Sequence, residues 1–182
     1  MRIVGPNCVG VMVPRLAFDA TFSHLAASVG SIAFVSQSGA ITTATLDWAV
    51  PRGIGFSCVV SLGDIADVDF GDVLDYLAVD PHTRAILLYV ERITHGRKFM
   101  SAERLASRVK PVVVLKAGRS EVGTRAAVTR IDPVAGADAV FDAAFRCAGM
   151  LRVATMAELF DAARDPGLDA RAGGRPGCDP DQ

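Results

Sequence analysis

A short turn of small polar residues, Ser36-Gln37-Ser38-Gly39-Ala40, gives the strongest local indication of an anion site in this sequence. It follows the apolar run 31–35 and precedes a predicted helix, so free backbone N–H groups gather there. These groups, the helix dipole and the hydroxyls of Ser36 and Ser38 favour a phosphate. A plain helix N-cap explains the same residues, because serine is common in that role. Both interpretations stay open.

A single acid, Glu91, follows the aliphatic run 86–90. In open α/β sheets, ligands gather at the carboxyl ends of the strands, and Glu91 belongs to the same predicted edge as the turn 36–40. A carboxylate there can orient a cationic imidazole or balance its charge. A solvated loop glutamate is the alternative interpretation.

Other ionisable residues give weaker indications of a site. Three acids share one loop, at Asp64, Asp67 and Asp69. Their spacing defines no coordination geometry, and a helix start that favours acids explains them better, so we predict no metal site. Three histidines have no neighbours typical of a triad or metal site, namely His24, His82 and His95. Four cations follow the predicted strand 112–116, and either contact with a phosphate or carboxylate or plain solvated surface charge explains them. They are Lys116, Arg119, Arg125 and Arg130.

Apolar runs alternate along the chain with segments that have a helical pattern. The runs predict strands at 31–35, 56–62, 85–90, 112–116 and 151–153. The segments between them predict helices at 40–50, 71–79, 98–109, 137–148 and 156–163. The central strands lack polar–apolar alternation, so we predict an α/β fold whose mainly parallel sheet is covered on both faces. Residues 1–30 indicate only a short strand and an irregular lead-in.

The overall composition excludes several functional classes. The 182 residues are 51% apolar and 21% charged, with a net charge of −1. There is no basic surplus for nucleic acid or an anionic membrane. No apolar run reaches the roughly 18 residues of a membrane span, and no signal-peptide core follows Arg2. Scattered cysteines without ligand spacing favour a cytoplasmic protein with reduced thiols.

Several segments, taken in order, carry a family resemblance. They lie at 5–10 (GPNCVG), 32–40 (IAFVSQSGA), 46–49 (LDWA), 55–57, 61–64, 86–91, 116–120 and 135–145. This ordered set resembles the α-subunit region of NDP-forming acyl-CoA synthetases, namely ADP-forming acetyl-CoA synthetases and, more distantly, succinyl-CoA synthetases. The resemblance runs from about residue 2 to residue 163. It implies a flavodoxin-like, three-layer α/β/α domain.

The resemblance also implies a chemistry. In that family, phosphate splits an acyl-CoA to an acyl phosphate, a histidine takes the phosphoryl group, and ADP or GDP receives it on an ATP-grasp domain. By resemblance, the turn 36–40 is one phosphate-binding helix start and Glu91 steadies the phosphohistidine. Asn7 and Cys8 would lie near the CoA thioester. CoA, phosphate and ADP or ATP are thus implied by the family rather than by a site complete in this chain.

The relay position departs from the family pattern. The family's histidine belongs to a Ser/Thr-His-Thr-Gly motif, and Arg130 occupies its place here. A guanidinium stays protonated and cannot accept a phosphoryl group in this way. Asp132 and Pro133 replace small residues, which adds a negative charge and removes an N–H group. We therefore expect the chain alone to be inactive.

The resemblance suggests how the chain is divided. Residues 1–30 would be the end of a truncated CoA-binding domain and a linker, and residues 31–163 the succinyl-CoA-synthetase-like domain. Residues 164–182 are rich in Gly, Pro, Asp and Arg and are predicted to be a disordered tail. CoA-binding and ATP-grasp domains or subunits would then act in trans.

Three functions fit these observations. The chain is a synthetase subunit domain whose partners supply CoA and nucleotide sites, a non-catalytic acyl-CoA-sensing or regulatory module, or an inactive gene remnant. The second function has its own resemblance, because the segments 74–78, 91–93 and 97–99 are similar to the synthetase-like half of bacterial protein lysine acetyltransferases. It would make an acetyltransferase domain a partner.

Overall fold

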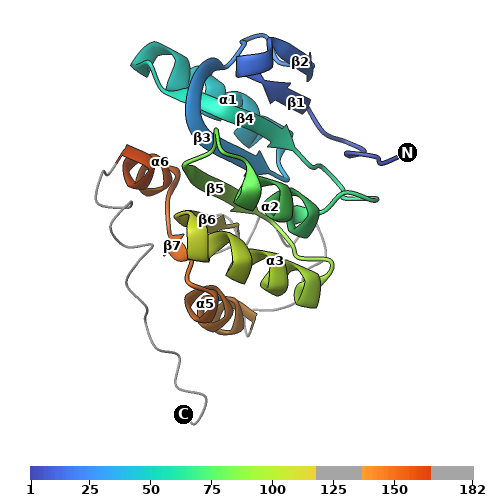
Figure 1. Ribbon diagram of the computed structural model, residues 1–182, viewed down its shortest axis with the longest axis vertical. Coiled ribbons are helices and arrows are strands. Elements are labelled where there is room, and N and C mark those ends of the chain that lie inside the picture. Colours follow the sequence, from blue (N-terminus) through green and yellow to red (C-terminus); the bar gives the residue numbers. More distant parts are fainter. Residues whose placement is uncertain (118–136, 165–182) are drawn as a thin grey trace.

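A seven-stranded sheet forms the centre of the protein in a computed structural model that describes residues 1–117 and 137–164 (Figure 1). The strand order is β2-β1-β4-β3-β5-β6-β7. Strands β3 to β7 pair in parallel, whereas β1 pairs antiparallel with both β2 and β4. The strands are β1 (Gly10–Val13), β2 (Phe18–Thr21), β3 (Ser28–Ser36), β4 (Gly55–Ser61), β5 (Ala85–Val90), β6 (Val112–Lys116) and β7 (Leu151–Val153).

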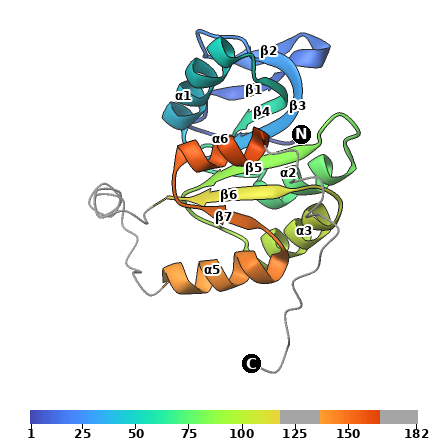
Figure 2. The same cartoon turned by 90° about the vertical axis from the view of Figure 1, so that its left-hand side faces the viewer.

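Helices cover both faces of this sheet. The described elements are α1 (Gly39–Ala49), α2 (Phe70–Val79), α3 (Gly96–Val109), α5 (Ala137–Ala148), α6 (Met156–Arg164) and the short 3-10 turns η1 (Pro14–Leu16) and η2 (Val50–Arg52). One face packs against α1 and α6, and the other against α2, α3 and α5 (Figures 1 and 2). The predicted three-layer, flavodoxin-like α/β fold with a mainly parallel sheet is confirmed.

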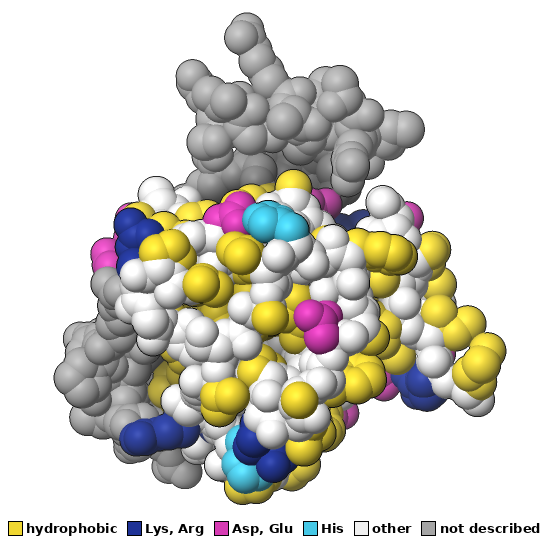
Figure 3. Space-filling view, turned by 90° about the horizontal axis from the view of Figure 1, so that it is seen from above, with side chains coloured by type: hydrophobic (Ala, Val, Ile, Leu, Met, Phe, Trp, Pro, Cys, Tyr) yellow, Lys and Arg dark blue, Asp and Glu magenta, His cyan; other side chains and the backbone are white. Residues whose placement is uncertain are grey.

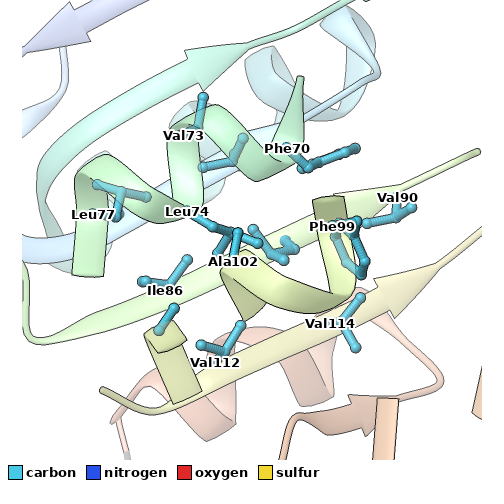
Figure 4. Packing of buried hydrophobic residues seen from close by; sticks show 14 of the residues in the cluster. Phe70, Val73, Leu74, Leu77, Ile86, Val90, Phe99, Ala102, Val112 and Val114 are labelled. Atoms are coloured by element: carbon cyan, nitrogen blue, oxygen red, sulfur yellow. The ribbon is translucent and has the colours of Figure 1, made fainter. Parts of the chain in front are cut away.

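The core explains why the central strands read as unbroken apolar runs. Leu74 of α2 and Phe99 of α3 lie against strand residues such as Ile86 and Val114 (Figure 4). On the opposite face, Leu87 belongs to the second cluster, so successive residues of β5 are buried on alternate sides. Each large side chain buried in this way contributes about 1.5–3 kcal/mol. The strand pattern therefore reflects burial on both faces.

The N-terminal part holds more structure than its pattern predicts. Residues 10–21 form two strands instead of one, and β1 joins the sheet through β4. Most side chains of this hairpin are half-buried or exposed, so its strands lack polar–apolar alternation. Apolar side chains are also exposed on the face that carries the hairpin (Figure 3). The exposed ones are Leu16, Phe18, Phe22 and Val29. The proposed division near residue 30 stays a prediction.

Some expectations fall outside the described residues. One concerns the predicted tail, of which residues 165–182 are not described. The others concern residues of the segment 118–136, namely Arg119, Arg125, Arg130, Asp132 and Pro133. Among the residues that are described, no helix is long and apolar enough to cross a membrane.

Candidate functional site

The carboxyl ends of β3, β4 and β5 meet at one edge of the sheet and form a pocket of about 350 Å³. Residues from the N-terminal segment, the start of α1 and the ends of β4 and β5 line it. They are Asn7, Cys8, Val9, Gln37, Ser38, Gly39, Ala40, Gly63, Asp64 and Glu91. The structure thus brings the turn 36–40, Glu91 and the segment of Asn7 and Cys8 to one pocket. Within that turn Ser36 does not line the pocket, and the other described candidates, among them Lys116, Asp67, Asp69 and the three histidines, lie outside its lining.

Ser36 and Ser38 build the turn that begins α1. The buried Ser36 hydroxyl donates to the Ser38 carbonyl at 2.9 Å and accepts the Ser38 N–H at 3.0 Å. Ser38 is the N-cap of α1, and its hydroxyl accepts the Ile41 N–H at 3.5 Å. The N-cap interpretation therefore describes the geometry of Ser38, whereas the Ser36 hydroxyl closes the turn before the helix. This arrangement leaves the N–H groups of Gly39 and Ala40, the first two helical residues, without an intrahelical acceptor.

Gln37 joins this turn to the end of β5. Its N–H donates to the Tyr89 carbonyl at 3.2 Å, which continues the β3–β5 pairing beyond the strand. Its side-chain Oε1 accepts the N–H groups of Glu91 at 2.7 Å and Arg92 at 2.8 Å. Glu91 is therefore held beside the start of α1, as its place after a parallel strand predicts.

The N-terminal segment forms the opposite wall of the pocket. The Val9 N–H donates to the Ser61 hydroxyl at 3.0 Å, and the carbonyl of Pro6 accepts the Asp64 N–H at 2.9 Å. Gly63 fits beneath this segment with a φ of +58°, and an added Cβ would come within 2.1 Å of the Pro6 oxygen. The family resemblance implied only that Asn7 and Cys8 lie near a CoA thioester, which stays a prediction, and no local pattern places them at this wall.

The cysteines differ in their surroundings. Cys8 lines the pocket and is partly exposed, with its thiol 3.7 Å from the Val4 carbonyl. Cys58 is buried in the core, and burial together with the charge of Asp80 raises the pKa of its thiol to about 12. Cys58 is therefore an inert packing residue of the core.

The charges around the pocket are unevenly distributed. Two carboxylates line it, at Asp64 and Glu91, whereas the described lining has no Lys, Arg or His. Cations lie just behind it, where Lys116 Nζ donates to the Glu91 carbonyl at 2.7 Å and Arg92 donates to the Asp64 carbonyl at 3.0 Å. Burial, followed by the charge of Glu91, raises the pKa of Tyr89. Because the described lining has no cation, a ligand anion would depend on neutral N–H donors.

The acidic loop serves the start of α2. Asp69 and Asp72 form a capping box with distances of 3.1 Å, and Lys98 pairs with both. Burial raises the pKa of Asp72, but hydrogen bonds from Lys98 and the Asp69 backbone and the charge of Lys98 bring it below its ordinary value. His95 Nδ1 lies 3.0 Å from Asp69. Within residues 1–117 and 137–164, no group of three potential ligands could hold a metal ion.

Comparisons with known proteins place the chain among relatives. Residues 29–164 match the family described as "Succinyl-CoA ligase like flavodoxin domain". The chain is 47% identical, over 88% of its length, to the ADP-forming acetate–CoA ligase I of Archaeoglobus fulgidus, of which it covers 24%. It is 44% identical, over 90% of its length, to subunit alpha of the ADP-forming acetate–CoA ligase I of Pyrococcus furiosus, of which it covers 36%.

A solved structure agrees with these relatives. It is the dinucleotide forming acetyl-coenzyme A synthetase 1 of Ca. Korarchaeum cryptofilum in complex with phosphate and ADP, with a TM-score of 0.81 and 39% identity. The match covers 88% of this chain and 35% of that one. The chain therefore spans only about a quarter to a third of the length of these relatives.

Proposed function

The chain belongs to the family of succinyl-CoA ligase like flavodoxin domains, and from this premise we propose that it is the phosphate-binding α/β domain of an ADP-forming acyl-CoA synthetase. One observation carries the proposal. The pocket joins the N–H groups that begin α1 to Glu91 and to the segment of Asn7 and Cys8. A helix start of this kind is suited to a phosphate. Two of the chain's relatives are ADP-forming acetate–CoA ligases.

The proposed role of each group follows from its chemistry. Phosphate accepts hydrogen bonds from the Gly39 and Ala40 N–H groups, which hold an oxygen ready to attack the carbonyl carbon of an acyl-CoA. The attack gives an acyl phosphate and releases CoA as its thiolate. CoA, bound with its thioester near Asn7 and Cys8, supplies the acyl group. By the family resemblance, Glu91 would orient the cationic imidazole of the relay histidine, whose position Arg130 occupies in this chain.

The test removes one N–H group from the start of α1. Gly39→Pro deletes the first helical N–H at a position where proline is well tolerated, since Ser38 before it is extended. Gly39→Ala is the matched control, because both variants add a Cβ about 3.0 Å from the Val9 side chain. Titration of inorganic phosphate, followed by ³¹P NMR, should show about tenfold weaker binding for the proline variant than for the alanine variant. Equal affinities would refute the proposed phosphate position.

Arg130 favours a second candidate, a module that binds acyl-CoA or phosphate without turnover. The residue stands at the relay position in the sequence, and a guanidinium is no phosphoryl acceptor. Incubation of the chain with labelled acetyl phosphate separates the two candidates. A labelled histidine supports a catalytic domain, whereas binding without labelling supports the module. An acetyltransferase partner belongs to this second candidate.

A further inference from the structure

Gln37 is the most enclosed polar side chain that lines the pocket, with only 7% of its surface exposed. Its two amide atoms have different surroundings. Oε1 accepts the backbone N–H groups of Glu91 and Arg92. Since only the oxygen of an amide can accept, this pair of bonds fixes which way the side chain is turned.

The other amide atom, Nε2, is left with two donor hydrogens. It has no hydrogen-bond partner in the described part of the chain. Nε2 is also not fully buried, unlike the carboxylate oxygens of Glu103 that lack a partner. The donor is therefore open to the space that Gln37 lines, which is the pocket. A donor held in place at the edge of a pocket is positioned to bind an oxygen of a ligand there.

The neighbouring donors point to the class of ligand. Gly39 and Ala40 begin α1 and line the same pocket with N–H groups that lack an intrahelical acceptor. Together with Gln37 Nε2 they make a set of neutral donors, and no cation lines the described pocket. Neutral donors fixed around one space suit an oxyanion with several acceptor oxygens.

We propose that Gln37 has two functions in one side chain: its Oε1 positions Glu91, and its Nε2 donates to an oxygen of the phosphate or acyl phosphate bound at the start of α1. This inference rests on the proposed phosphate site and deepens it. Gln37 thereby couples the position of the acid to the position of the anion. A displaced Gln37 would disturb both at once.

Two substitutions separate the two functions. Gln37→Glu keeps an oxygen that accepts from Glu91 and Arg92, but it replaces the donor with an acceptor and adds a charge. Gln37→Met has nearly the same length and no charge, and it loses both the acceptor and the donor. Both variants thus lack the Nε2 donor, whereas only the methionine variant also lacks the oxygen that accepts the Glu91 and Arg92 N–H groups. Ser101→Ala, on the exposed surface of α3, is the control.

The readouts are phosphate affinity and the protection of two amides. Titration of inorganic phosphate and, separately, of acetyl phosphate should show at least tenfold weaker binding for both Gln37 variants and no change for the control. Hydrogen exchange should leave the Glu91 and Arg92 amides protected in Gln37→Glu and speed their exchange in Gln37→Met. Unfolding midpoints should stay within about 3 °C of the parent for Gln37→Glu.

Several results would overturn the proposal. If either Gln37 variant binds both anions as tightly as the parent, Nε2 does not donate to the anion. If the Glu91 and Arg92 amides of Gln37→Met are as protected as in the parent, Oε1 does not position Glu91. If Gly39→Pro still weakens phosphate binding in the first case, the phosphate site stands without Gln37. If the parent chain binds neither anion, the phosphate site and the role of Gln37 fall together.

Discussion

Glu103 is the most unusual residue outside the pocket. It lies on α3, is 0% exposed, and neither of its carboxylate oxygens has a hydrogen-bond partner in the described chain. Burial raises its pKa to about 8, and the charge of Arg104 only partly opposes this. Its place in the helical pattern, four residues after Phe99 and three before Ala106, is the signal that could have revealed it, because those neighbours form the buried stripe of α3.

The raised pKa of Glu103 makes stability depend on pH. In the unfolded chain the group has an ordinary pKa of 4.5, and in the folded protein about 8, so folding favours the protonated form. The contribution is complete below pH 4.5 and is lost as pH rises toward about 8. Urea unfolding should show Glu103→Gln gaining about 2–4 kcal/mol over the parent between pH 5 and pH 9.

The control for this effect is Asp161→Asn, which removes an exposed acid from α6. It should follow the pH dependence of the parent, because its side chain is not buried. If Glu103→Gln also keeps the parent's pH dependence, the buried carboxyl is not protonated in the folded protein and the account of Glu103 is wrong.

The pocket depends on a single glycine at the end of β4. Gly63 has a φ of +58° and lies directly under the N-terminal segment, with no room for a Cβ beside Pro6. Gly53 has a similar φ of +65°, but an added Cβ there meets nothing within 4 Å. The two positions share the backbone penalty of about 1 kcal/mol for a left-handed conformation and differ only in the clash.

We therefore expect Gly63→Ala to lower the free energy of unfolding by about 1–3 kcal/mol more than Gly53→Ala does. It should also weaken phosphate binding, because the segment of Asn7 and Cys8 must move away from the start of α1. Chemical denaturation and phosphate titration of the two variants measure this. Equal losses of stability would mean that the N-terminal segment is not packed tightly on Gly63.

The elements themselves were largely predictable. Strands buried on both faces have long apolar runs, and α3 alternates between buried and exposed sides, so their ranges agree with the structure within a few residues. The hairpin of β1 and β2 was not predictable, because β1 is mostly half-buried, β2 is mostly exposed and neither period is present. Likewise, Glu91 could be placed at the edge by its strand, whereas the hydrogen bond that Gln37 accepts from the Glu91 N–H, 54 positions away, could not.

At the scale of the whole molecule, the pocket lies where the chain changes direction. After β3 the chain leaves to α1 on one face of the sheet, and after the adjacent strand β5 it leaves to α3 on the other face. A crevice forms between two such strands, and ligands of open α/β sheets bind there. The fold therefore provides the pocket, while Gln37, the glycines and the N-terminal segment give it its chemistry.

This division of roles predicts what happens when the N-terminal segment is removed. Strand β1 begins at Gly10, so deletion of residues 1–9 leaves every strand of the sheet intact but removes the wall formed by Asn7, Cys8 and Val9. Circular dichroism should show an unchanged content of helix and strand, and phosphate should bind about three- to tenfold more weakly, since water then reaches the start of α1. Deletion of residues 1–2 is the control, because it keeps the hydrogen bonds that the carbonyls of Ile3, Gly5 and Pro6 accept from the loop after β4. Phosphate binding as tight in the longer deletion as in the shorter one would show that the wall takes no part in the site.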